Sequence, residues 1–355
     1  MTSPTRSSCC ATTLVASATS PGTTAAGRKG HNGRVDRLRI GVVGGGPWVR
    51  HGYAPAIAAH ARSDLTALWT RRPEAAEELA AEFGGRAQAT FEDLLDQVDA
   101  VALAVPPQVQ SGLAVEAAKA GKHLICEKPL ATSVEDALAV VTAVREAGVL
   151  SSMMLTLRHD QQVQEWLTVL PRGPLKNDTL GSARWLSGAL LNGPFARSSW
   201  RREHGALLDI GPHLIDMMDA ALGPVTGVDW ARHDEPDLWR FGLTHAGGAQ
   251  STVTTSLRLP VYPSETEFTV FGAAGNHRLI RRPTDTRACF ARLLDEFIAA
   301  ATCAGPPPAL DAARGAHLQA VIEQVRVSAN RSASMPGEWA RHGGTAADGR
   351  SVSAQ

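Results

Sequence analysis

Apolar and polar residues alternate along this chain in two different ways. In the first part, short apolar runs typical of buried strands are separated by longer stretches with helical spacing. Strands that alternate with helices predict a parallel, doubly wound sheet. The expected strands are 38–43, 65–69, 100–105, 123–126 and 149–154, and the expected helices are 53–61, 73–83, 91–95, 109–120 and 134–147.

A second pattern begins near residue 180. Apolar and polar residues now alternate with a period of two, and glycine-rich turns separate the runs, which indicates antiparallel strands with one exposed face. We therefore expect an α/β doubly wound domain followed by an α+β domain with an open, mostly antiparallel sheet. The expected strands are 180–191, 225–232, 238–244, 250–259 and 265–271, and the closing helices are 286–301 and 312–327.

These patterns divide the chain into four parts. Residues 1–36 and 331–355 show no period and are expected to be disordered tails, 37–155 the first ordered domain, and 156–330 the second. The run 9–18 is mildly apolar but interrupted by polar residues, so we interpret it as part of a tail rather than as an export signal. A cytoplasmic location follows from this interpretation.

The composition of the chain excludes several classes of protein. The chain has 355 residues, of which 44% are hydrophobic, and its 35 Lys+Arg balance its 35 Asp+Glu. A formal charge of zero argues against nucleic-acid or membrane-surface partners, and no apolar run is long enough to span a bilayer. The five cysteines lack metal-ligand spacing, so we expect free thiols in a reducing compartment and no metal site.

A glycine turn follows the first expected strand. Gly44, Gly45 and Gly46 stand between that strand and a helical stretch, where a pyrophosphate can approach the backbone and the helix N-terminus. Val49 occupies the position of the third glycine of the usual fingerprint.

The tip of the next strand carries Thr70, Arg71 and Arg72. NAD enzymes usually have an acidic residue at this tip for the ribose hydroxyls. A hydroxyl and two guanidinium groups are better suited to a 2′-phosphate, so NADP is favoured over NAD. The alternative is a solvated turn before the helix at 73–83.

Glu127 and Lys128 stand at the carboxyl end of a buried strand that Pro129 ends. Ligands bind at this edge of an open parallel sheet. The alternative is a surface ion pair at a strand tip.

In the second domain, Asp209 precedes a helix in whose first turn His213 lies. The helix dipole disfavours a charged imidazole there, which keeps His213 available as a base. Asp209 is placed to orient this ring or a substrate hydroxyl. The alternative is that Asp209 caps the helix and His213 is a core residue.

Together these motifs resemble the Gfo/Idh/MocA family of NAD(P)-dependent oxidoreductases, over roughly residues 37–328. The resemblance implies a Rossmann domain, a second domain whose open sheet forms a homo-oligomer interface, and Lys128, Asp209 and His213 as catalytic residues. It also implies a set of substrate-binding and cofactor-binding residues. The substrate-binding residues are Lys128, Arg158, Trp200, Arg201, Asp209 and His213. The cofactor-binding residues are Gly44, Gly45, Gly46, Trp48, Thr70, Arg71, Arg72, Val105, Pro106, Gln110, Glu127 and Lys128.

The chain departs from the family pattern in three places. Gln110 stands where a histidine is usual, Val49 replaces a small residue, and the stretch between Gly275 and Thr286 is short. The third departure is expected to trim a sheet edge or a helix connection.

The expected activity is hydride transfer between NADP(H) or NAD(H) and a secondary alcohol or carbonyl, on a sugar, polyol or related cyclic molecule. His213 would take the alcohol proton, Lys128 would stabilise charge on the reacting oxygen, and Glu127 would orient Lys128 or border the nicotinamide. Two alternatives remain open. One is a lyase or glycosidase that recycles its cofactor, and the other is a non-catalytic NAD(P)-binding sensor or subunit.

Overall fold

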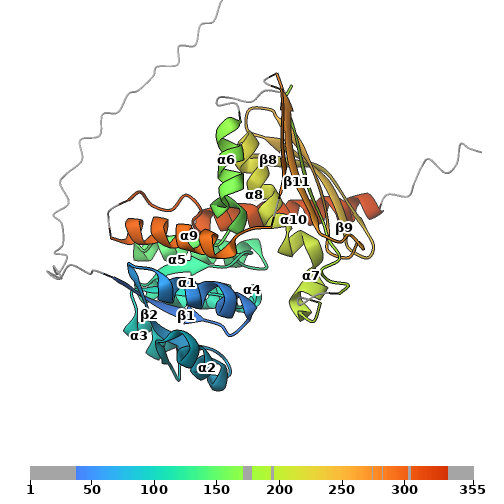
Figure 1. Ribbon diagram of the computed structural model, residues 1–355. Helices are drawn as coiled ribbons and strands as arrows, with labels where there is room; N and C mark the ends of the chain where they lie inside the picture. The colour runs from blue at the N-terminus through green and yellow to red at the C-terminus, as the bar shows by residue number, and fades with distance from the viewer. Residues whose placement is uncertain are drawn as a thin grey trace, which may run out of the picture. The chain divides into compact units, whose positions relative to one another are not determined.

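The computed structural model describes residues 37–170, 178–192, 196–273, 275–281, 283–302 and 305–334 (Figure 1). The tail expected at 1–36 lies outside these residues, as does the chain from 335 onward. Helix α10 (Ala312–Ser334) continues four residues beyond the boundary expected at 330, because its helical backbone does not end with the apolar pattern.

The first sheet confirms the predicted doubly wound fold. Its six strands lie in the order β3-β2-β1-β4-β5-β6, and every neighbouring pair is parallel. The order reverses between β1 and β4, which opens a crevice at the carboxyl ends of these two strands. The strands are β1 Leu38–Val43, β2 Ser63–Trp69, β3 Arg86–Ala87, β4 Ala100–Leu103, β5 His123–Cys126 and β6 Ser151–Met153.

Helices connect these strands as expected, with one irregularity at the first crossover. The expected helix at 53–61 is preceded by a π-helical turn, η1, and Val49 is fully buried where it begins. The connecting helices are η1 Val49–Tyr53, α1 Ala54–Ala59, α2 Pro73–Phe83, α3 Phe91–Gln97, α4 Pro107–Lys119 and α5 Val134–Ala147. A 3₁₀ turn η2 (Thr156–His159) and helix α6 (Gln161–Val169) lead to the second sheet.

The second sheet is mostly antiparallel, as predicted, and includes one parallel pair. Its order is β12-β11-β7-β10-β9-β8, and β7 pairs with β10 in parallel while the other neighbours are antiparallel. The edge strand β12 was not predicted, because only Leu279 of it is buried and no period of two marks it. The strands are β7 Leu180–Leu186, β8 Val225–Asp234, β9 Leu238–His245, β10 Gln250–Ser256, β11 Glu265–Gly272 and β12 Gly275–Ile280.

One face of this sheet is covered by helices, and the other is open (Figure 1). Helices α7 (Ser199–Asp209) and α8 (Gly211–Leu222) contact the covered face, where alternate residues such as Ala183, Val253 and Phe268 are at most 1% exposed. The open face carries large apolar side chains instead, namely Leu180, Trp230 and Phe271, which are between 43% and 50% exposed.

The last two helices join the two halves of the described chain. Helix α9 (Thr286–Ala301) packs Phe290, Leu293 and Phe297 into the same hydrophobic cluster as strand β1, and α10 packs against α5 and β8. The described residues from Arg37 onward accordingly pack as one compact unit.

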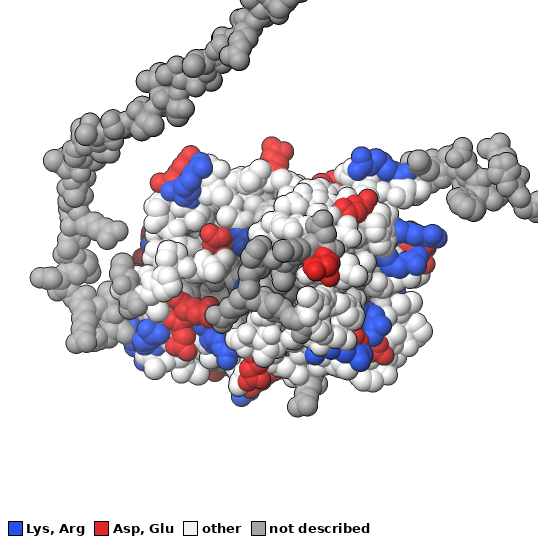
Figure 2. Space-filling view, turned by 90° about the horizontal axis from the view of Figure 1, so that it is seen from above, with Lys and Arg blue, Asp and Glu red and all other residues white. Residues whose placement is uncertain are grey.

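The surface of this unit carries mixed charge. On the face shown in Figure 2, Lys and Arg side chains lie among Asp and Glu side chains rather than in a patch of one sign. Within the described ranges, no helix combines the length and the apolar character needed to cross a membrane.

Candidate functional site

A cavity of about 380 Å³ lies at the reversal point of the first sheet. The turn after β1, the tip of β2 and the turn after β4 form its walls. This is where open parallel sheets bind ligands. Its lining residues include the expected Gly44, Gly45, Gly46, Thr70, Arg71, Arg72, Val105 and Pro106.

The glycine turn is shaped for close approach. Gly44 has a φ of 121°, and a Cβ on it would lie 2.4 Å from the carbonyl oxygen of Ala104, so only glycine fits there. A Cβ on Gly46 would meet no protein atom within 4 Å, so its backbone faces free space. The turn can therefore receive a phosphate group against its backbone, and these residues fit a dinucleotide.

The tip of β2 presents cations to this cavity. Arg71 and Arg72 are exposed and line it, while Thr70 is buried. The Thr70 hydroxyl accepts a hydrogen bond from the backbone N–H of Arg72 at 3.2 Å and donates to its carbonyl oxygen. The threonine thus shapes the turn, and the two arginines are the groups available to a ligand.

Gln110 has a different place from the one expected. It is fully buried and does not line the nucleotide cavity. Its Oε1 accepts from the Glu127 N–H at 2.9 Å, and its Nε2 donates to the Glu127 carbonyl oxygen at 2.7 Å and to the carbonyl of Pro129. Gln110 clamps the loop after β5 because an amide offers both a donor and an acceptor.

Glu127 lies behind that loop rather than along a cavity wall. The Tyr53 hydroxyl donates to its Oε1 at 3.0 Å, and the Lys128 backbone N–H donates to its Oε2 at 3.3 Å. Burial raises the pKa of Glu127 to about 7, although the Lys128 charge and the Tyr53 hydrogen bond oppose the shift. The glutamate therefore orients the backbone of Lys128.

A second cavity of about 260 Å³ lies where the loop after β5 meets the junction of α7 and α8. One end of the second sheet closes it, through residues at the ends of β7 and β10 and just beyond β12. Trp48 lines this cavity and not the first one, and it lies only two residues after Gly46. The segment from Gly46 to Trp48 therefore contributes residues to both cavities.

Lys128 and Asp209 meet in this second cavity. The Lys128 ammonium donates to Asp209 Oδ1 at 2.7 Å and to the Asp209 carbonyl oxygen at 2.8 Å, and the two side chains are 8% and 9% exposed. Arg201 Nε donates to Asp209 Oδ2 at 2.9 Å. Burial alone would raise the pKa of Asp209, but the charges of Lys128 and Arg201 outweigh it and lower the pKa.

His213 lines the same cavity from the first turn of α8. Burial and the positive charge of Lys128 lower its pKa well below the ordinary histidine value, so the imidazole is neutral. Its ring stacks on Trp185 with a centroid distance of 6.1 Å, and its Nδ1 is buried without a partner among the described residues. Asp209 was expected to orient this ring or a substrate hydroxyl, and its carboxylate binds Lys128 and Arg201.

A local kink sets the position of Asp209. Gly205 interrupts α7 with a φ of 63°, and a Cβ there would lie 2.2 Å from Asp237 Oδ1. The Asp237 carboxylate accepts from the backbone N–H groups of Ala206 and Leu257, at 2.9 and 3.0 Å. The chain is thereby anchored just before Asp209, and Asp209 does not cap the following helix.

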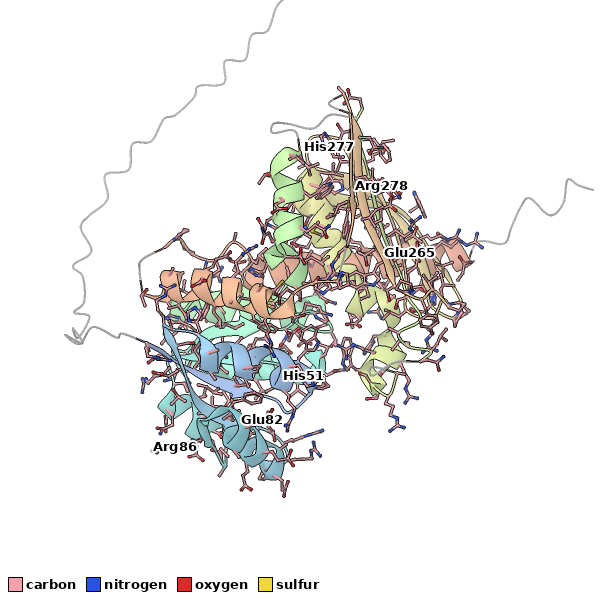
Figure 3. The ribbon with its side chains drawn as sticks, viewed as in Figure 1. His51, Glu82, Arg86, Glu265, His277 and Arg278 are labelled. Carbon is pink, nitrogen blue, oxygen red and sulfur yellow. The ribbon has the colours of Figure 1, made fainter. Side chains whose placement is uncertain are left out.

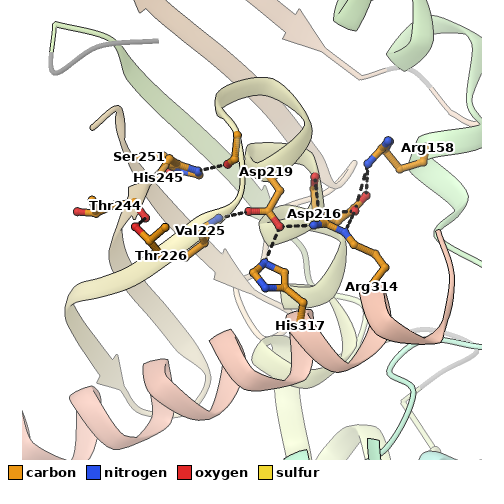
Figure 4. A network of polar contacts seen from close by, with 11 residues as sticks. Arg158, Asp216, Asp219, Val225, Thr226, Thr244, His245, Ser251, Arg314 and His317 are labelled. Carbon is orange, nitrogen blue, oxygen red and sulfur yellow. Dashed lines mark hydrogen bonds and ion pairs between the residues drawn. The ribbon is translucent and has the colours of Figure 1, made fainter. Parts of the chain in front are cut away.

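Arg158 and Trp200 were expected in the substrate site, but neither lines the cavity. Arg158 Nη1 donates to Asp216 at 3.2 Å, within a network that also joins Arg314 to Asp216 and Asp219 (Figure 4). Because Asp216 is one turn after His213 on α8, this network fixes the helix that carries the histidine. Trp200 stacks against the Arg201 guanidinium, whose carbon is 4.8 Å from the ring centroid.

Several residues of the cavity were not anticipated. Trp185, Ser187, Ser264 and Arg281 line it, and the Ser187 and Ser264 hydroxyls are 2.7 Å apart. They come from the ends of strands, and one of them follows the unpredicted β12. Arg281 gave a signal, because it follows the apolar pair Leu279-Ile280, but strand pairing alone brings these residues together.

Comparisons with known proteins agree with this architecture. Residues 38–155 match the family described as "Oxidoreductase family, NAD-binding Rossmann fold", and residues 174–278 match the "GFO/IDH/MocA C-terminal domain". The structure of the WlbA dehydrogenase from Bordetella pertussis, in complex with NADH and UDP-GlcNAcA, is similar with a TM-score of 0.73 at 23% identity. The similarity covers 83% of this chain and 96% of that one.

Two curated relatives match over part of their length. A dTDP-3,4-didehydro-2,6-dideoxy-alpha-D-glucose 3-reductase from Streptomyces violaceoruber is 31% identical over 58% of this chain and 61% of its own. Levoglucosan dehydrogenase from Pseudarthrobacter phenanthrenivorans is 29% identical over 55% of this chain and 54% of its own. The chain thus spans less than two thirds of these relatives. With both domains matched in order, the chain belongs to the Gfo/Idh/MocA family, whose first domain is an NAD-binding Rossmann fold.

Proposed function

We propose that this protein is an NAD(P)-dependent oxidoreductase that acts on a secondary alcohol or carbonyl of a sugar or related cyclic molecule. The observation that carries the proposal is the meeting of Lys128, Asp209 and His213 in one cavity. The segment that forms the glycine turn of the nucleotide cavity also supplies Trp48 to this cavity. If His213 were only a packing residue and Lys128 only part of a surface ion pair, the two would not be expected to line the same cavity.

The residues of the first cavity would hold the cofactor. The backbone of Gly44–Gly46 would receive the pyrophosphate, and Arg71 and Arg72 would face the ribose end. When bound, the nicotinamide supplies the hydride acceptor or donor. Trp48, between the two cavities, would exclude water from one side of the reacting centre.

His213 and Lys128 would handle the proton and the charge. A neutral imidazole can accept the proton of an alcohol, and the low pKa of His213 keeps it neutral at physiological pH. An ammonium has three N–H bonds, and Asp209 occupies two of those of Lys128. The third is available to hydrogen-bond the reacting oxygen and to stabilise negative charge on it.

The walls of the second cavity support a sugar as substrate. Thr156, Ser187, Ser264, Thr284 and Thr286 supply hydroxyl groups around Trp185 and Trp48. Hydroxyls and aromatic faces suit a molecule that carries many hydroxyls on an apolar ring. The names of the two curated relatives refer to sugars as well.

We also propose a preference for NADP(H) over NAD(H). Arg71 and Arg72 line the cavity, and none of the described residues that line it is acidic. Replacing Arg71 with Asp should weaken NADP(H) binding by about tenfold more than NAD(H) binding, because a charge-assisted contact to the 2′-phosphate is lost. Titration of both cofactors decides this, and tighter binding of NAD(H) by the wild type would refute the preference.

The activity itself is tested by screening neutral and charged sugars, inositols and nucleotide sugars with both cofactors. An oxidoreductase produces reduced nicotinamide, followed by absorbance, in proportion to product. A product that appears without net reduction would indicate a recycling lyase or glycosidase. Cofactor binding without turnover of any compound would indicate a sensor.

The open face of the second sheet is proposed as the contact between copies in a homo-oligomer. Leu180, Trp230 and Phe271 lie together on it, and such apolar surface favours association. Replacing Trp230 with Glu should convert an oligomer to monomer in sedimentation measurements. A wild type that sediments as a monomer would rule the contact out.

A further inference from the structure

The charges on the wall of the second cavity are unbalanced. Among the described residues, three cationic side chains line it, Lys128, Arg201 and Arg281, and Asp209 is the one carboxylate. Asp209 bonds to both Lys128 and Arg201. His213 is neutral, since burial and neighbouring cations lower its pKa. A substrate in this cavity therefore meets a net positive wall.

Arg281 carries the excess charge. Among the described residues, no carboxylate lies within ion-pair distance of its guanidinium. Asp160 is near enough only to oppose the lowering of the Arg281 pKa that burial causes. Its Nη2 donates to the Thr284 hydroxyl, and its Nε is buried without a partner in the described chain. Burying part of an unpaired guanidinium costs free energy unless an anion pairs with it.

Packing places this guanidinium beside the reacting groups. The Arg281 guanidinium carbon lies 5.2 Å from the centroid of the Trp185 ring, and the same ring stacks on His213. Arg281 also contributes to the lowered pKa of His213. A substrate whose anionic group is bound by Arg281 would thus carry that group and its reacting carbon on one small sugar ring.

Resting on the oxidoreductase function proposed above, we propose that the substrate is an anionic monosaccharide whose carboxylate or phosphate is bound by Arg281. The planar fork of an arginine matches either oxyanion. A cavity of about 260 Å³ suits a single sugar ring and leaves little room for a nucleotide.

The test compares sugars that differ only in charge. Values of kcat/KM are measured for a hexose, the corresponding hexuronate and the corresponding hexose phosphate. We expect the wild type to favour one or both anions by about ten- to a hundredfold, the contribution of a charge-assisted contact. Equal values, or a preference for the neutral hexose, would overturn the proposal. Preference for the hexuronate or for the phosphate identifies the oxyanion.

Variants assign that preference to Arg281. Arg281→Gln should lower the anion-to-neutral ratio of kcat/KM by about the same factor, mainly through KM, and Arg281→Lys should retain part of it. The matched control is Arg278→Gln. Arg278 is an exposed arginine three residues earlier that pairs with Glu267 on the edge of the sheet, near His277 (Figure 3). A ratio unchanged by Arg281→Gln, or lowered equally by both variants, would refute the assignment.

Binding provides a readout that does not depend on turnover. Calorimetry measures the affinity of the cofactor-loaded wild type for the hexuronate and the hexose phosphate. If no sugar is oxidised but an anion binds and Arg281→Gln abolishes its binding, the oxidoreductase function fails while the anion site stands. If nucleotide sugars bind best and Arg281→Gln has no effect on them, the anion site fails and the oxidoreductase function stands.

Discussion

The two cavities of this protein are built in opposite ways. The nucleotide cavity is made from backbone turns, glycines and apolar walls that follow neighbouring strands of one sheet. The second cavity is made from charged and polar side chains that come from the loop after β5, the junction of α7 and α8, and the far end of another sheet. The first can therefore be altered through shape and the second through charge.

The difference also separates binding from chemistry. In the nucleotide cavity, backbone N–H groups and exposed arginines are expected to bind the phosphate groups of the ligand. These protein groups bind without gaining or losing a proton. In the second cavity, burial and neighbouring charges shift the pKa values of Asp209 and His213 in the directions that a charged carboxylate and a neutral base require. Perturbed groups that gather in one cavity are typical of a catalytic site.

The largest effects are expected from the charged cavity. His213→Ala should lower kcat by about 10²–10⁴, because the proton acceptor is removed. Lys128→Ala should lower it by about 10²–10³ through the loss of oxyanion stabilisation. The double variant should fall short of the product, since groups acting on one oxygen are not additive. Cofactor titration serves as the control, and losses that multiply fully would show that the two residues act separately.

An intermediate effect is expected from Glu127, which lies behind the loop after β5. Its pKa rises from 4.5 in the unfolded chain to about 7 in the folded protein. The folded protein holds this proton to higher pH, so the stabilising contribution is present below pH 4.5 and is lost as the pH rises to about 7. The loss corresponds to roughly 3 kcal/mol.

Denaturant unfolding across this pH range measures the effect. Glu127→Gln cannot titrate, so its unfolding free energy should decline less with pH than that of the wild type. Glu77→Gln, at an exposed position of α2, is the control and should follow the wild type. Parallel curves for all three proteins would contradict the raised pKa.

The smallest effects are expected in the glycine turn, where two positions separate shape from ligand space. Gly44→Ala should lower the unfolding free energy by about 1–3 kcal/mol, because its positive φ and its contact with Ala104 both oppose a side chain. Gly46→Ala should change stability by less than about 0.5 kcal/mol, since its Cβ meets no protein atom. Its added methyl group should instead weaken cofactor binding. Equal stability of the two variants would contradict this view of the turn.

The elements with strong periodicity were predicted well. Strands β1 and β5 and helices α2, α5 and α9 begin and end where the sequence indicates. Glycine or proline marks several of these ends, such as Gly148 after α5 and Pro73 at the start of α2. The errors occur where the pattern is weak. Strand β12 has one buried residue, and the parallel pairing of β7 with β10 depends on partners distant in sequence.

The sequence by itself determined the parts that depend on neighbouring residues. These are the alternation of strands and helices in the first domain, the glycine turn, and the place of Lys128 at a strand end. Local spacing and turn chemistry encode such features. Only the tertiary structure decided that Gln110 clamps a loop, that Arg158 binds Asp216, and that Arg281 faces the second cavity. These roles depend on which strands pair and on how burial distributes charge, and neither is encoded in the spacing of residues along the chain.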